Sequence, residues 1–80
     1  AVFALIDLYK ETGQWKKLPA VYDAALEGET DGEKRRDLMV EAARIQEDRL
    51  RKPEMAFFGY LQALKENPLD PWLREQAERL

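Results

Sequence analysis

A short motif that occurs twice is the feature that most constrains the fold of this chain of 80 residues. The motif is a tyrosine followed by a small and a large apolar residue. It stands at Tyr22-x-x-Ala25-Leu26 and again, 38 residues later, at Tyr60-x-x-Ala63-Leu64. Self-similarity at such a period is typical of repeat proteins, in which each repeat is one supersecondary unit that packs against its neighbours. The sequence therefore predicts two copies of one structural unit.

Glycine and proline divide the chain into five segments whose apolar residues follow helical spacing. The predicted helices cover residues 1–12, 15–27, 31–51, 53–66 and a last segment that starts at residue 70. Few β-branched residues and no sustained alternation of apolar and polar residues argue against strands. The sequence thus predicts an all-α protein of about five helices.

Capping residues set the expected helix ends. Gly13 suits the position just after a helix, where a positive φ is common. Thr30-x-x-Glu33 reads as a capping box that opens the third helix. Asp70 is the predicted N-cap of the last helix, with Pro71 at its first position. These signals predict where three of the five helices meet their loops.

The repeat and the breakers together predict antiparallel helical hairpins. Residues 1–28 form the first hairpin, residues 29–68 the second, and residues 69–80 a cap or the start of a third. One hairpin of this size cannot bury its apolar face alone, so the hairpins are expected to stack as an α-solenoid. Gly59 costs about 1 kcal/mol in a helix relative to Ala, which predicts a close approach by a neighbouring helix.

The second unit carries Ala56-x3-Tyr60-x2-Ala63-x4-Pro68, and this run resembles the closing half of a tetratricopeptide repeat (TPR). The first unit carries the related run Leu18-x3-Tyr22-x2-Ala25. The family's period is about 34 residues. The longer period here is attributed to the loop at 28–32 and to one extra residue before position 52. A half-a-TPR repeat and another kind of α-solenoid are the alternatives.

The residue types that carry most enzyme chemistry are missing. The chain contains no Cys, His or Ser, which removes the usual nucleophiles, the usual general base and the commonest metal ligand. The carboxylates are predicted to form ion pairs along solvated helix faces, as in Arg44 with Asp48 and Glu75 with Arg79. We therefore expect no enzyme activity, no cofactor and no metal.

Charge and hydropathy argue against two other classes of partner. The net charge of −3 opposes binding to nucleic-acid phosphates, and the basic runs at 34–36 and 49–52 are short and flanked by acids. No stretch approaches the roughly 20 apolar residues that span a bilayer. The sequence predicts neither nucleic-acid binding nor membrane insertion.

A protein-interaction scaffold remains the expected function. In the TPR family, the first helices of successive repeats line a concave groove that holds a partner's peptide or helix. The resemblance implies these partner-binding residues: Phe3, Asp7, Lys10, Glu41, Arg44, Asp48, Trp72, Glu75 and Arg79. Phe3 and Trp72 would anchor apolar side chains, and the carboxylates would pair with a basic ligand. The Lys/Asn clamp that some members use for a C-terminal carboxylate is missing, so that ligand is not expected.

The alternative is a structural or self-assembly segment of a larger helical-repeat protein, with no ligand of its own. Terminal repeats need a polar outer face, and Arg74 and Glu78 give the last helix such a face. The first helix is apolar on both faces. This difference predicts that further repeats precede it, and that the short chain self-associates through Ala1, Leu5 and Leu8.

Overall fold

Five α-helices and one 3₁₀ turn make up most of the chain. The computed structural model describes residues 2–80. In chain order the elements are α1 (Val2–Glu11), the 3₁₀ turn η1 (Trp15–Lys17), α2 (Leu18–Gly28), α3 (Gly32–Asp48), α4 (Pro53–Glu66) and α5 (Pro71–Arg79). No strand occurs among these residues. The predicted all-α class is confirmed.

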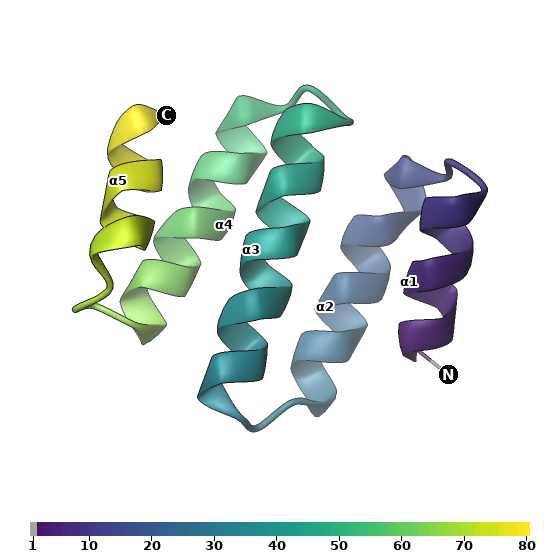
Figure 1. The fold of residues 1–80 in the computed structure, drawn as a ribbon, viewed down its shortest axis with the longest axis horizontal. Coiled ribbons are helices and arrows are strands. Elements are labelled where there is room, and N and C mark those ends of the chain that lie inside the picture. Colours follow the sequence, from purple (N-terminus) through teal and green to yellow (C-terminus); the bar gives the residue numbers. More distant parts are fainter. Residues whose placement is uncertain (1) are drawn as a thin grey trace.

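The helices lie side by side in chain order, in two layers. Each helix packs mainly against the helices before and after it in the chain. In Figure 1, α1, α3 and α5 lie nearer to the viewer than the fainter α2 and α4. The Cα atoms fill a slab of 34 × 29 × 14 Å. A thickness near 14 Å fits two layers whose helix axes are about 9 Å apart. We call these the odd layer and the even layer.

Gly13 ends α1 as predicted. Its φ is +72°, in the left-handed region. The Gly13 N–H donates to the Lys10 carbonyl at 3.3 Å, and the Gln14 N–H donates to the Tyr9 carbonyl at 2.8 Å. These two bonds form a Schellman motif, which satisfies carbonyls that the helix end would otherwise leave free.

The end of α3 forms a turn like that at Gly13, but its closing hydrogen bond spans one residue more. Arg51 stands 38 residues after Gly13 and is the non-glycine residue with a positive φ, at 53°. The Lys52 N–H donates to the Gln46 carbonyl at 2.7 Å, one residue farther back than the equivalent bond at Gln14. The helix accordingly ends at Asp48, three residues before the predicted end at 51, because the left-handed residue breaks the helical bonding.

The two residues with positive φ, Gly13 and Arg51, give a first prediction. A left-handed conformation costs a residue with a Cβ roughly 1–2 kcal/mol, whereas glycine adopts it freely. We expect Gly13→Ala to lower the free energy of unfolding by about 1 kcal/mol and Arg51→Gly to raise it by a similar amount. Urea titration followed by circular dichroism measures both. Equal signs for the two variants would contradict this account.

The N-cap of α3 is Asp31, so the predicted capping box at Thr30 is wrong. The Asp31 Oδ1 accepts the N–H groups of Glu33 at 2.9 Å and Lys34 at 3.3 Å. A carboxylate accepts stronger hydrogen bonds than a hydroxyl does, and its charge is favourable at a helix N-terminus. Asp31 therefore takes the N-cap position that the spacing of Thr30 and Glu33 assigned to Thr30.

The repeated motif supplies the centres of two core clusters. Tyr22, Ala25 and Leu18 are buried with Ile6, Leu38 and Ile45 where α1, α2 and α3 meet. The second cluster joins α3, α4 and α5, and it consists of Met39, Val40, Ala43, Ala56, Tyr60, Ala63 and Leu73. The two tyrosines are 0% and 1% exposed, so both serve in packing.

Gly59 lies at the point where α3 and α4 approach closely. A Cβ at this position would lie 3.1 Å from the Ala43 Cβ and 3.7 Å from the Ala43 Cα. The atoms that it would meet belong to a helix backbone and its first side-chain carbon, which cannot swing away. The close approach that the sequence predicted at Gly59 is confirmed.

Candidate partner-binding groove

A hollow of about 460 Å³ lies between α1 and α3 on the odd layer. Two buried residues, Ile6 and Leu38, form its apolar floor, and Phe3 lies at its edge with 60% of its surface exposed. The rest of the lining is charged and consists of Asp7, Lys10, Glu29, Lys34, Asp37 and Glu41. The hollow thus combines a small apolar base with a polar rim.

A second hollow, of about 440 Å³, lies between α3 and α5. Its lining consists of Arg36, Asp37, Val40, Glu41, Arg44 and Trp72. Asp37 and Glu41 also line the first hollow, because they lie one turn apart on the exposed face of α3. The two hollows therefore form one surface across α1, α3 and α5, which we call the odd-layer groove.

Tyr22 connects the even layer to this groove. Its side chain starts on α2, is buried, and donates its hydroxyl hydrogen to the Glu41 Oε2 at 3.2 Å. Burial raises the pKa of the Tyr22 phenol well above its ordinary value, and the negative charges of Glu41 and Asp7 raise it further. The hydroxyl thus stays protonated and holds the Glu41 carboxylate in place.

The raised pKa of Tyr22 predicts a loss of stability in alkali. Unfolding frees the phenol to ionise near its ordinary pKa of about 10, so the stabilisation is complete below that pH and is lost as the pH rises above it. Tyr22→Phe should reduce the fall in the urea midpoint between pH 8 and pH 11. A residual fall is expected, because burial also raises the pKa of Tyr60. An unchanged pH profile in Tyr22→Phe would contradict this assignment.

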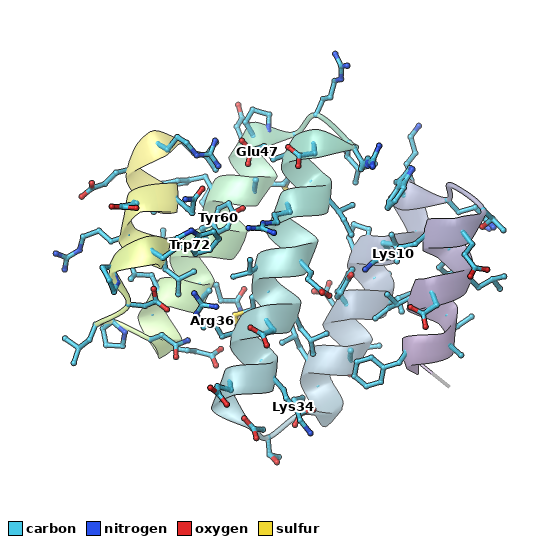
Figure 2. All side chains as sticks on the ribbon, viewed as in Figure 1. Lys10, Lys34, Arg36, Glu47, Tyr60 and Trp72 are labelled. Atoms are coloured by element: carbon cyan, nitrogen blue, oxygen red, sulfur yellow. The ribbon has the colours of Figure 1, made fainter. Side chains whose placement is uncertain are left out.

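Trp72 is a half-buried residue and is already in contact with three side chains. Its ring meets Tyr60 edge to face, with centroids 6.0 Å apart. The guanidinium carbons of Arg36 and Arg44 each lie 5.5 Å from its ring centroid. Figure 2 shows Trp72 between α5 and α3, with Arg36 on the α3 side. Much of Trp72 therefore serves to pack α5 onto α3.

Asp70 fixes the start of α5 against α3. Its Oδ1 accepts the Leu73 N–H at 3.2 Å, which confirms Asp70 as the N-cap, and its Oδ2 accepts the Arg36 Nε–H at 2.6 Å. These bonds to Arg36 and to the backbone hold the pKa of Asp70 below its usual value. The hydrogen bond from Arg36 to Asp70 thus fixes one side of the hollow between α3 and α5.

Arginines of the basic run 34–36 also act within the protein. Arg35 donates to the Leu26 carbonyl at 2.6 Å and, through Nε, to the Glu66 Oε1 at 3.0 Å. The guanidinium therefore neutralises the carbonyl end of α2 and links α3 to α4. Its charge is used in packing rather than presented on an open surface.

The ion pairs differ from those that helical spacing predicted. Arg79 binds Glu47 of α3 through both nitrogens, at 2.5 and 2.8 Å, instead of pairing with Glu75 on its own helix. Arg44 lies over Trp72 rather than beside Asp48. A bidentate pair between helices has better geometry than a pair of flexible side chains one turn apart, so the prediction of pairs within one helix is wrong.

The structure brings together six of the nine predicted partner-binding residues. Phe3, Asp7, Lys10 and Glu41 line the hollow between α1 and α3, and Glu41, Arg44 and Trp72 line the hollow between α3 and α5. Figure 2 shows Lys10 on the side of α1 that faces α3. The other three, Asp48, Glu75 and Arg79, line neither hollow.

Sequence reasoning missed several lining residues, above all Asp37. It lies four residues before Glu41, so helical spacing from Glu41 places it on the same face. Arg36, Lys34 and Glu29 were missed because their place in the groove depends on how the helices pack.

Other exposed apolar side chains lie away from the groove. Leu5 and Leu8 on α1 are 40% and 48% exposed, and Ala1, the third member of the predicted self-association surface, lies outside the described residues. On the even layer, Met55 and Phe58 are 51% and 62% exposed, beside a hollow of about 210 Å³. Self-association through Leu5 and Leu8 stays a prediction.

No protein-family model, curated protein or solved structure matches this chain. Among residues 2–80, no helix is long and apolar enough to cross a membrane. In the same part of the chain, the carboxylates do not gather into a group of three that would hold a metal ion.

Proposed function

We propose that this chain is a TPR-like helical repeat that acts as a protein–protein interaction scaffold and holds a partner's peptide or helix in the odd-layer groove. The observation that carries the proposal is the sharing of Asp37 and Glu41 between two adjacent hollows. Because of it, the two hollows adjoin on α3 and together extend over α1, α3 and α5. An extended segment or a helix fits such a surface better than a small molecule does.

The lining of the groove supports binding of a polypeptide. Exposed Phe3 offers an aromatic anchor near buried Ile6 and Leu38, and charged side chains surround these three. An apolar centre with a polar rim is the usual anatomy of a protein interface. The alternative is a structural or self-assembly segment, and exposed Leu5 and Leu8 favour it.

Paired phenylalanine variants test the groove. Phe3 on the odd layer and Phe58 on the even layer are 60% and 62% exposed, so replacing either by Ser removes a similar apolar surface. Dodecapeptides selected from a displayed random library on the wild-type chain serve as probes. We expect Phe3→Ser to weaken binding at least tenfold in fluorescence anisotropy, and Phe58→Ser to leave it unchanged. Far-UV circular dichroism checks that both variants keep their helices.

The outcomes of this test separate the candidate functions. Loss of binding in Phe58→Ser alone would move the binding surface to the even layer and overturn the groove. A chain that selects no peptide, but self-associates in sedimentation equilibrium until Leu5 and Leu8 are both replaced by Gln, would favour the self-assembly segment. Trp72→Ala is a poor probe, because loss of its contact with Tyr60 would also loosen α5.

A further inference from the structure

We propose that the hollow between α1 and α3 recognises a basic side chain, Lys or Arg, that stands next to a large apolar residue in the partner segment. The inference rests on the proposed function and names the class of ligand for that groove.

The floor accounts for the apolar half of the ligand. Ile6 and Leu38 are 4% and 6% exposed, and Phe3 stands beside them with most of its ring open to solvent. A large aliphatic or aromatic side chain placed here would cover the exposed ring. Covering apolar surface removes it from water, which favours binding. The floor is small, so one such side chain fills it.

The charged rim of the hollow explains why the ligand would carry a basic side chain. Four carboxylates and two lysines line this hollow, which gives it an excess of negative charge. Among the described residues, Asp7 and Glu41 form no ion pair, and Asp37 contacts a cation only at 3.6 Å, through Arg36. Carboxylates without an ion pair inside the protein are available to a partner's cation.

Asp7 on α1 and Glu41 on α3 line the same hollow from two helices. The hydroxyl of Tyr22 donates a hydrogen bond to Glu41 at 3.2 Å. Tyr22 is fully buried and thus rigid, which fixes the position of Glu41. A ligand's ammonium or guanidinium placed between the two carboxylates would gain from both without reordering the groove.

The hollow between α3 and α5 differs in charge. Arg36 and Arg44 lie over Trp72 there, and they face the same Asp37 and Glu41 from the other side. A ligand's basic residue at this end would meet two arginines, so its favoured place is over α1 and α3. The groove therefore also favours one direction for a bound segment.

Charge reversal within the groove is the test. The library selection on the wild-type chain is repeated on Asp7→Lys and on Asp23→Lys, which makes the same change on the exposed surface of α2. We expect wild-type selections to be enriched in Lys or Arg next to a large apolar residue. Asp7→Lys should weaken the best peptide at least tenfold, and Asp23→Lys should leave it within twofold. Raising KCl from 0.05 M to 0.5 M should weaken the wild-type complex.

The results separate this inference from the function on which it rests. Peptides that depend on Phe3 but show no enrichment in Lys or Arg, or that bind Asp7→Lys as well as wild type, overturn the ligand class and leave groove binding intact. A selection that yields no Phe3-dependent peptide overturns both. Tighter binding to Asp7→Lys of the same peptide with Glu in place of its basic residue would support the inference directly.

Discussion

Replacement of Tyr60 by Ala is expected to remove about 4 kcal/mol from the free energy of unfolding. Tyr60 is 1% exposed and lies where α3, α4 and α5 meet, so the truncation leaves a cavity that the helices cannot close without sliding. It also removes the edge-to-face contact with Trp72. A domain of this size is typically stable by about 4–12 kcal/mol, so the variant would be partly unfolded. Urea denaturation at pH 7, followed by circular dichroism, measures the loss.

Two further variants separate the cavity from other causes. Tyr60→Phe keeps the ring and should cost less than about 1.5 kcal/mol. Phe58→Ala removes an aromatic ring of similar size that is 62% exposed, and it should change the stability by less than about 0.5 kcal/mol. A loss in Phe58→Ala as large as in Tyr60→Ala would contradict burial as the cause, because Ala is the better helix former at both positions.

The parts of the fold that follow from local chemistry were predictable. Gly13 and Asp70 end and begin helices through bonds to their nearest neighbours, so the sequence contains all that is needed to predict them. Tyr22 and Tyr60 hold the same place in the repeat and are both core residues, since an aromatic residue kept at the same place in both units has the same packing task. The close approach at Gly59 was predictable, because a glycine destabilises a helix interior and is favoured there where a neighbouring helix leaves no room for a side chain.

The parts that depend on the packing of distant residues were not predictable. Arg79 and Glu47 are 32 residues apart, and their pairing depends on how far α5 is shifted along α3. The same shift places Arg36 and Arg44 over Trp72, which turned an expected open anchor into a half-buried contact. Helical spacing assigns faces to single helices, but it does not give the register between two helices.

The groove was predictable only in part, for the same reason. The resemblance implied residues on the first helices, and Phe3, Asp7 and Glu41 do line one hollow. Asp48 lies outside both hollows, because it is two turns beyond Glu41, at the end of α3. The α3 face between Asp37 and Glu41 is shared by both hollows, which only the packed structure reveals.

Replacement of Gly59 by Leu is expected to cost about 3 kcal/mol, although leucine is the better helix former by nearly 1 kcal/mol. The first added carbon already lies 3.1 Å from the Ala43 Cβ, tighter than ordinary contact. Since Ala43 is 1% exposed and has no flexible side chain, α3 and α4 must separate to admit the new group. Separation of these helices would also open the cluster around Tyr60.

The matched control for this substitution is Gly28, which also lies in a helix. A Cβ at Gly28 would meet nothing within 4 Å, so Gly28→Leu should be neutral or stabilise the protein by up to about 1 kcal/mol. Gly59→Ala should fall between the wild type and Gly59→Leu, because one carbon requires a smaller shift of α3. Thermal and urea unfolding of the four proteins measure the series. A gain in stability for Gly59→Ala and Gly59→Leu would mean that α3 and α4 are not in close contact. Packing would then not require a glycine at position 59.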